Sequence, residues 1–357
     1  MPEYSILLDN DRELQKAFLS LPSRLYTRKT NPQDRKCEQE ILREKHVLSG
    51  DFSVLPFVVL KSGRPVSRAL LTVYPGDREG YFGFFESEND KEAVKLLMEA
   101  VKKKAKSLGL SSLAGPVNAS FWIGYRLKTD HFGEEPYTGE PYNPDYYPAL
   151  FTACGFTASD RYYSNHFRQI PEDYHNKRME KRREQFAERG IVLQNLDPEK
   201  YDETMHEVYF LLTALYSDFP AFKMISEEKF MKLFASYRLI VNPDMVKFAY
   251  DQGKMVGFFI CVPDYGNALY GPLSPRLIRT LLWRRKHAKR YVLPYLGADP
   301  AYLGLGPVLT DAVIRELQKN RALSIGALIH EHKVTGNYAR DLLIGMDEYT
   351  LYRLELR

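Results

Sequence analysis

The order of apolar and polar positions predicts two successive sets of strands and helices. The first half reads as two strands joined by the turn KSGRP (55–60 and 67–74), a third strand (80–86) and a helix (90–108). A short strand (112–117), a short helix (146–154) and a final strand (162–168) follow. The helix over 90–108 has apolar residues at helical spacing and ends before Gly109, which suits the position after a helix C-terminus.

The second half repeats this plan in the same order. It reads as a strand (191–195), two helices (198–215 and 226–238) and a hairpin around the turn DQGK (246–250 with 255–262). A basic helix (276–290), a strand (291–298), a helix (307–320), a strand (324–330), a short helix (337–344) and a last strand (349–356) follow. The charged segment 171–190 separates the halves and predicts an exposed helix. We therefore expect an α/β (α+β) protein of two domains, over 1–170 and 171–357.

Composition narrows the class of protein. The chain has 357 residues, of which 44% are hydrophobic and 27% charged, with a net charge of +4. This charge is too small to indicate nucleic-acid binding by itself. The three cysteines are far apart, so we expect neither a disulfide framework nor a bound metal. No basic, apolar leader and no bilayer-length apolar run is visible, and a cytoplasmic protein is expected.

Several short motifs, in this order, resemble the GNAT superfamily of N-acetyltransferases. They are GYFGFFE (80–86), GPVNAS (115–120), YNPDYYPALFTACGF (142–156), GKMVGFFICVPDYGNAL, LGADPAYLGLG and YTLYRLEL, and they cover both halves. The resemblance is to tandem two-domain bacterial GNAT-like proteins. It implies two mixed sheets flanked by helices. It also implies an acyl-CoA, most simply acetyl-CoA, as cosubstrate.

The loop from 296 to 308 is the candidate for the CoA diphosphate. The first amides of a helix lack partners and favour anions, and glycine lets the backbone approach the ligand. The family loop reads Gln/Arg-x-x-Gly-x-Gly/Ala. Gly304 and Gly306 match its small positions, whereas Ala301 replaces the polar one and Pro307 lacks an amide hydrogen. The expected contacts are Leu296, Gly297, Ala298, Leu303, Gly304, Leu305, Gly306, Pro307 and Val308.

The same turn in the first half differs in charge. Ser87, Glu88, Asn89 and Asp90 contain no glycine and two carboxylates, which would repel a diphosphate and cap the next helix. We therefore expect one CoA site, in the second half. Basic residues 284–290 are candidates for the 3′-phosphate.

Acyl transfer to an amine needs a proton acceptor and a proton donor. Glu331, flanked by His330 and His332, is a candidate base, and Tyr349 is a candidate acid. Alternatively, His330, Glu331 and His332 are a polar strand end that faces water. Tyr349 can equally be a packing residue, which is the usual role of a tyrosine in a strand. Asn118, Trp122, Asn143 and Tyr147 are expected to line a cleft between the halves.

Three functions remain open from the sequence. The first is an acyl-CoA-dependent N-acyltransferase, acetyl most simply, acting on a small amine or a peptide. The second is an inactive GNAT-like protein that binds a ligand or partner, which Ala301 favours. The third is an aminoacyl-tRNA-dependent transferase. The basic helix over 276–290 fits a solvated face, CoA phosphate, RNA or an acidic membrane surface. The acceptor, the acyl chain and the oligomeric state are not specified.

Overall fold

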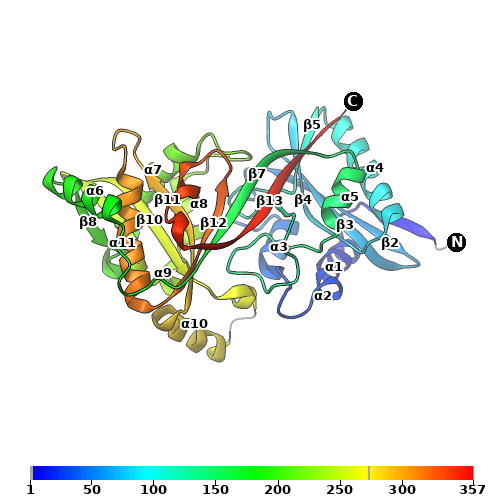
Figure 1. The fold of residues 1–357 in the computed structure, drawn as a ribbon. Coiled ribbons are helices and arrows are strands. Elements are labelled where there is room, and N and C mark those ends of the chain that lie inside the picture. Colours follow the sequence, from blue (N-terminus) through cyan, green and yellow to red (C-terminus); the bar gives the residue numbers. More distant parts are fainter. Residues whose placement is uncertain (1–2, 272–273, 357) are drawn as a thin grey trace.

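The computed structural model describes residues 3–271 and 274–356, which form one continuous mixed sheet (Figure 1). Its 13 strands follow the order β1-β2-β3-β4-β5-β13-β7-β12-β11-β10-β9-β8, and β6 pairs with β13 beside this path. The strands are β1 (Tyr4–Leu7), β2 (Ser53–Lys61), β3 (Arg64–Val73), β4 (Glu79–Ser87), β5 (Ser112–Gly115), β6 (Leu127–Lys128), β7 (Thr157–Phe167), β8 (Val192–Asn195), β9 (Val246–Asp251), β10 (Lys254–Pro263), β11 (Arg290–Ala298), β12 (Leu323–His330) and β13 (Leu343–Glu355).

Helices cover both faces of this sheet. They are α1 (Arg12–Ser20), α2 (Pro22–Leu25), α3 (Arg35–Leu42), α4 (Lys91–Ser107), α5 (Tyr147–Ala153), α6 (Lys177–Glu188), α7 (Tyr201–Tyr216), α8 (Glu227–Phe234), α9 (Tyr237–Ile240), α10 (Pro275–His287) and α11 (Leu305–Asn320). Alternate residues of a strand point to opposite faces. Accordingly, Val58 packs in the cluster that contains α1, whereas its neighbour Val59 packs in the cluster that contains α4.

The helices follow the apolar spacing read from the sequence. In α4 the residues at 93, 94, 97, 98, 101 and 105 are all buried, and the Asp90 carboxylate accepts the Ala93 amide at the N-terminus. In α11 the buried residues include Leu305, Val308 and Leu309. No helix in the described ranges is long and apolar enough to cross a bilayer.

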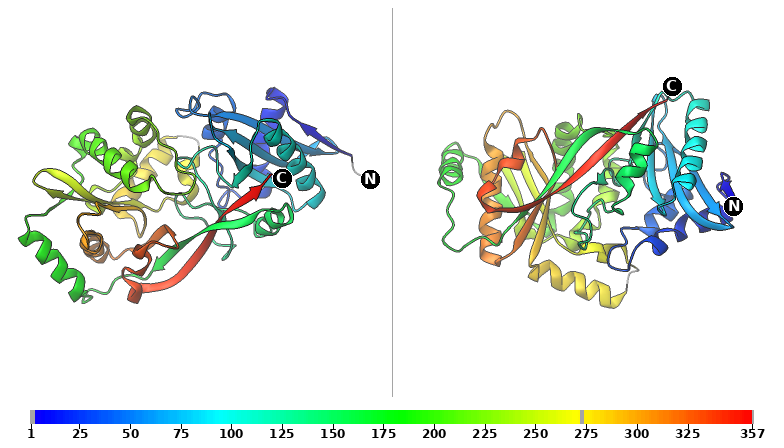
Figure 2. Two further views of the ribbon diagram at one scale, coloured as in Figure 1. Left: turned by 90° about the horizontal axis from the view of Figure 1, so that it is seen from above. Right: turned by 45° about the vertical axis from the view of Figure 1, so that its right-hand side comes forward.

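The two halves exchange their last strands. The C-terminal strand β13 lies between β5 and β7 of the first half, with Tyr352 opposite Gly115 and Tyr349 opposite Tyr162. In return, β7 pairs with β12 of the second half, with His166 opposite Ile325. Figure 2 shows β7 and β13 as a long pair between the halves. Each half therefore completes the sheet of the other, across the boundary predicted near residue 171.

The prediction of a helix over 337–344 is wrong. Two 3₁₀ turns, Val334–Asn337 and Arg340–Leu342, occupy this segment, and β13 begins at Leu343 rather than at 349. The Leu342 side chain is buried in the core beneath α11, and Leu343 then pairs with Phe167 of β7. Tertiary pairing therefore decides the conformation of a segment too short to be a stable helix by itself.

Candidate functional site

The turn from β11 into α11 leaves several amides without partners. Gly304 adopts a left-handed conformation with φ +95 and precedes the first turn of α11. The Leu305 amide donates to the Tyr302 carbonyl at 3.0 Å. By contrast, the amides of Leu303, Gly304 and Gly306 have no hydrogen-bond partner within the described chain. Three amide donors at a helix N-terminus are therefore available to an anion.

A cation from another helix lies directly over this turn. Helix α6 packs along α11, and a Cβ atom at Gly304 would overlap the Arg182 guanidinium. Arg182 has no carboxylate within ion-pair distance among the described residues, whereas its neighbour Arg183 pairs with Asp311 at 3.4 Å. Arg182 thus provides a cation near the turn, where the family loop has a Gln or Arg and this chain has Ala301. The first helix of the second half, α6, supplies it, and no sequence motif signals it.

The basic residues from 284 to 290 lie elsewhere. They form the end of α10 and the start of β11, whereas the glycine turn at Gly304 follows the end of β11 (Figure 1). At about 3.3 Å per residue, the nine residues of the strand separate them by roughly 30 Å. The expectation that these residues meet the 3′-phosphate of a CoA at this turn is therefore wrong.

Beyond the turn, β11 and β12 diverge into a V-shaped gap. They pair only from Arg290–Leu323 to Leu293–Gly326. Past this point the edges of both strands line a cavity of about 1190 Å³. On one face of the sheet the wall comes from α11 and the segment 335–342, and on the other it comes from α7, α9 and α10. The gap therefore connects the groove beside α11 with a large chamber between the halves.

The lining of this cavity is mainly apolar. Aliphatic side chains from several helices contribute to it, among them Leu215, Leu239, Leu281, Leu282 and Ile314. Of the predicted loop contacts, Leu296, Gly297 and Ala298 line the cavity. Leu305 and Val308 are buried against the core, and Leu303 is 87% exposed. Tyr338 covers Gly306, since its hydroxyl lies 2.9 Å from the position of a Cβ there.

The corresponding gap in the first half is filled by the chain itself. Strands β4 and β5 pair up to Tyr81 and Ala114, but the Val117 amide then bonds to the Phe82 carbonyl at 2.9 Å. The Asn118 side-chain oxygen accepts the Phe84 amide at 2.7 Å. The interstrand space is thus occupied, which supports a single CoA site in the second half.

The turn before α4 is also occupied by ion pairs. Glu88 pairs with Arg24 at 2.9 Å and with Arg64 at 3.1 Å, and Asp90 pairs with Lys61 at 2.6 Å. Carboxylates therefore fill the place that a diphosphate would need.

All four predicted cleft residues line the cavity, and each also has a structural hydrogen bond. Trp122 donates its indole N–H to the Lys223 carbonyl at 2.8 Å. Asn143 accepts the Lys128 amide at 2.7 Å, and Tyr147 donates to Glu86 at 2.7 Å. Together with Asn118, these residues shape the wall and also hold it in place.

The two predicted proton-transfer residues lie outside the cavity wall. Glu331 is exposed, and its carboxylate accepts the Arg161 amide at 3.3 Å. Tyr349 is fully buried at the β13–β7 pairing, and its hydroxyl donates to Glu140 at 2.6 Å. Burial, with Tyr137 and Glu140 alongside, raises the pKa of Tyr349.

His330 is a titratable side chain at the open end of the gap. It ends β12, lines the cavity and packs edge-on against Tyr162. One ring nitrogen, Nε2, lies 3.3 Å from an Asp160 carboxylate oxygen, and Nδ1 lies 3.3 Å from the His332 amide. Both contacts are long for hydrogen bonds, so a substrate can compete for the ring.

A buried carboxylate marks the opposite end of the cavity. Glu86, at the end of GYFGFFE, accepts hydrogen bonds from Tyr26 at 2.8 Å and from Tyr147 at 2.7 Å. Burial raises its pKa to about 7, although nearby Arg68 opposes this shift. Glu86 lies on β4, four strands from β12, or roughly 19 Å along the sheet. No sequence motif marks Glu86 as a site residue, and it reads only as the end of a strand.

Glu86 should make stability depend on pH. Because the folded protein holds this proton more tightly than the unfolded chain, stability falls as pH rises from the ordinary value of 4.5 to about 7. Glu86→Gln keeps an acceptor for both tyrosines but does not titrate. Relative to wild type, it should gain up to about 3 kcal/mol between pH ~5 and pH ~8 in urea unfolding. The exposed Glu99→Gln should gain none, and an equal change in both variants would contradict the assignment.

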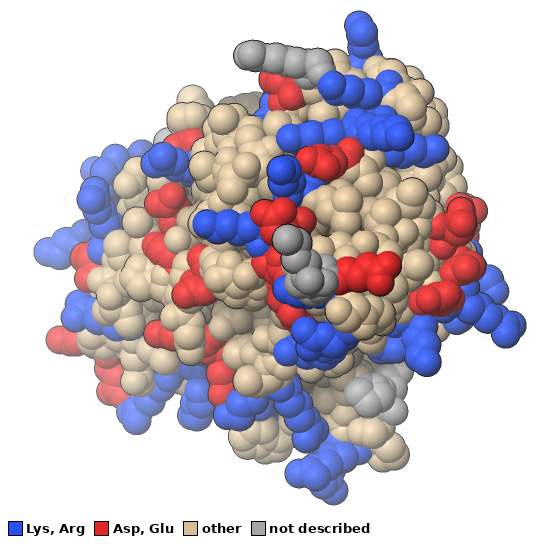
Figure 3. Space-filling model, turned by 90° about the vertical axis from the view of Figure 1, so that its right-hand side faces the viewer, with Lys and Arg blue, Asp and Glu red and all other residues tan. Residues whose placement is uncertain are grey.

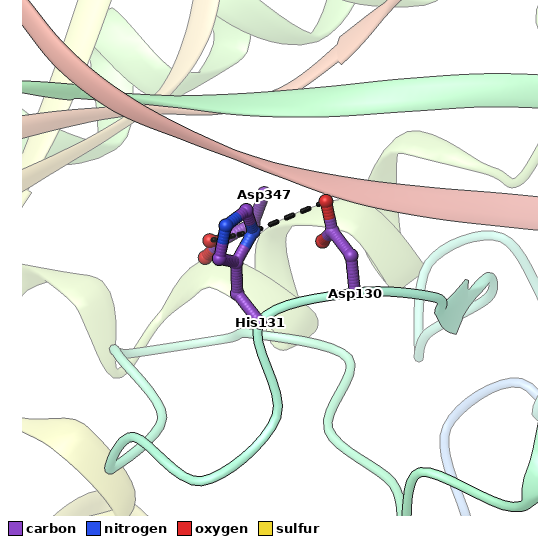
Figure 4. A group of neighbouring side chains, drawn as sticks. All are labelled: Asp130, His131 and Asp347. Carbon is purple, nitrogen blue, oxygen red and sulfur yellow. Dashed lines mark ion pairs between the residues drawn. The ribbon is translucent and has the colours of Figure 1, made fainter.

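One group of described residues has the spacing of metal ligands, and it reads as an ion-pair cluster. His131 Nδ1 lies 3.1 Å from Asp130 and 3.6 Å from Asp347 (Figure 4). Asp347 already contacts His166 at 2.9 Å and Lys128 at 3.3 Å. The Lys128 ammonium disfavours a second cation beside this carboxylate.

Charges on the end of the molecule formed by the first half are mixed. Lys and Arg alternate with Asp and Glu over this face (Figure 3). Nucleic-acid-binding surfaces instead gather one sign of charge, so the described residues of this face do not favour such a partner.

Comparison with known sequences finds a distant relative. The chain is 24% identical over 305 residues to a bacterial ceramide synthase of Caulobacter vibrioides, covering 80% of this chain and 78% of that protein. No family model matches the chain.

Two solved structures share the architecture. A tandem GNAT protein from the clavulanic acid biosynthesis pathway is 13% identical with a TM-score of 0.54, covering 100% of this chain and 99% of that one. A GCN5-related N-acetyltransferase from Kribbella flavida is 9% identical with a TM-score of 0.50, covering 99% of this chain and 72% of that one. The predicted α/β class and tandem GNAT fold are confirmed.

Proposed function

We propose that this chain, which has the tandem GNAT fold, is an acyl-CoA-dependent N-acyltransferase acting on a lipophilic amine. One observation carries the proposal: free amides beside Arg182 lie at the turn that follows β11, and the gap between β11 and β12, lined by Gly297 and Ala298 at the end of β11, opens into a large apolar cavity. An acyl-CoA has the matching order of parts, namely a diphosphate, a narrow pantetheine arm and an apolar acyl chain.

The residues fit these parts one by one. The free amides at the turn and Arg182, which lies over Gly304, suit the diphosphate, because a helix N-terminus with free donors and a nearby cation favours an anion. The groove between α11 and the segment 335–342 suits the pantetheine arm. The chamber beyond the gap suits the acyl chain and the acceptor.

The reaction joins the amine nitrogen to the thioester carbonyl. The C–N bond forms, the C–S bond breaks, and the products are an amide and free CoA thiol. The attacking nitrogen loses one proton, which His330 accepts, and the departing sulfur gains one. Asp160 beside His330 stabilises the charged ring that this transfer produces.

Two observations favour a long acyl chain over an acetyl group. The cavity of about 1190 Å³ exceeds the usual range for small-molecule pockets and is mainly apolar. The curated relative is a ceramide synthase, and a ceramide is a long-chain amine carrying a long N-acyl group. A sphingoid-type amine is therefore the acceptor class that we favour.

Acyl transfer is tested by measuring CoA thiol release with sphinganine as acceptor. Activity should rise from acetyl-CoA to palmitoyl-CoA, with kcat/KM at least about tenfold higher for the longer chain, because each buried methylene adds to binding. Equal rates would support a small acyl group. No thiol release with either donor, despite CoA binding, would favour an inactive binding protein.

A further inference from the structure

We propose that α10 and the adjoining residue Leu239 form a docking surface for the face of an anionic phospholipid bilayer, through which the acceptor enters the cavity. Entry of a lipid acceptor rests on the proposed function. Docking itself does not depend on that function, because it is argued from the exposed side chains of α10 and of Leu239.

Helix α10 exposes apolar residues that a folded surface normally covers. None of its residues is buried. Ile278 is 49% exposed, Leu282 47% and Trp283 59%, and Leu239 on the adjacent α9 is 63% exposed. Figure 1 shows α10 at the lower edge of the molecule. An exposed cluster of this kind marks an interaction surface.

The charges on the same helix have one sign. Residues 275–290 contain no acidic residue. Besides Arg290 they contain six arginines and lysines, namely Arg276, Arg279, Arg284, Arg285, Lys286 and Lys289. None of these six Arg and Lys side chains forms an ion pair with a described carboxylate, whereas Arg290 pairs with Asp264 at 2.5 Å. Cations flanking Trp and aliphatic side chains are typical of helices that lie in the interface of an anionic bilayer.

The apolar side of α10 is continuous with the cavity. Leu239, Leu277, Ile278, Leu281 and Leu282 all line it. A helix lying in the headgroup region would therefore place the cavity mouth against the lipid phase. An RNA partner would use the cations but would leave this aliphatic wall in water, so the bilayer accounts for more of the surface.

Flotation with vesicles tests the docking. Wild-type protein should bind vesicles of phosphatidylcholine mixed with phosphatidylglycerol and should bind pure phosphatidylcholine at least about tenfold more weakly. Arg279→Glu with Lys286→Glu, and separately Ile278→Gln with Leu282→Gln, should each lower binding by about tenfold or more. The matched charge change Lys95→Glu with Lys103→Glu, on exposed α4 positions, should leave it unchanged.

Equal binding by all three variants would overturn the docking proposal, as would RNA binding at low salt without vesicle binding. Titration with CoA in solution separates this result from the proposed function. Variants of α10 that lose vesicle binding should bind CoA normally. If CoA fails to bind the wild type while vesicles are still bound, the proposed acyl transfer fails and the docking surface stands.

Discussion

Replacing His330 with glutamine should lower kcat for N-acylation by about 100- to 10,000-fold, with little change in the affinity for acyl-CoA. This range is typical for removal of a general base. His330 borders the cavity where β11 and β12 separate, whereas its neighbours Glu331 and His332 are exposed. Single-turnover rates at saturating acyl-CoA measure the effect, and circular dichroism checks the fold.

Two neighbouring substitutions provide matched controls. His332→Gln and Glu331→Gln should retain near wild-type rates, because neither side chain lines the cavity. A larger loss in Glu331→Gln than in His330→Gln would instead support Glu331 as the base and contradict the role given to His330.

Reversing the charge of Arg182 should weaken CoA binding by about 100-fold. A hydrogen bond to a charged group contributes about 1.5–3 kcal/mol, and the glutamate in Arg182→Glu adds repulsion. Arg182 is part of a helix that packs on α11, yet it has no ion pair among the described residues whose loss would destabilise the fold. Isothermal titration with CoA gives the dissociation constants.

Arg178→Glu is the control for this experiment. Arg178 is exposed and lies about one turn earlier on α6. Its replacement by glutamate changes the net charge by the same amount as Arg182→Glu. Wild-type affinity in Arg178→Glu together with weak binding in Arg182→Glu would assign the effect to the position. Equal losses would indicate a long-range effect of net charge and remove Arg182 from the site.

The apolar spacing and capping residues of each segment predict most helices and strands, because these elements depend mainly on their own local sequence. The helix α4 buries the positions given by its spacing, and Asp90 caps it as expected. The fold class could therefore be predicted. The strand exchange could not, since the pairing of Tyr352 with Gly115 depends on contacts far apart in the chain. A sequence pattern specifies which face of a strand is buried but not its partner.

The candidate site was predicted where backbone chemistry defines it and missed where tertiary packing does. The glycine turn is visible because Gly304 needs a left-handed conformation. Arg182 and Glu86 are not visible, since one sits in a charged helix and the other ends an ordinary strand. Their roles arise from the groups that packing places beside them, namely the turn at Gly304 and the hydroxyls of Tyr26 and Tyr147.

The central claim is that one CoA binds per chain with its diphosphate at the turn before α11. A crystal structure of the protein soaked with CoA tests this most directly. We predict diphosphate density within hydrogen-bond distance of the Leu303 and Gly304 amides and the Arg182 guanidinium, and none at Ser87–Asp90. Density at the turn before α4, or a CoA that avoids the β11–β12 gap, would contradict the account.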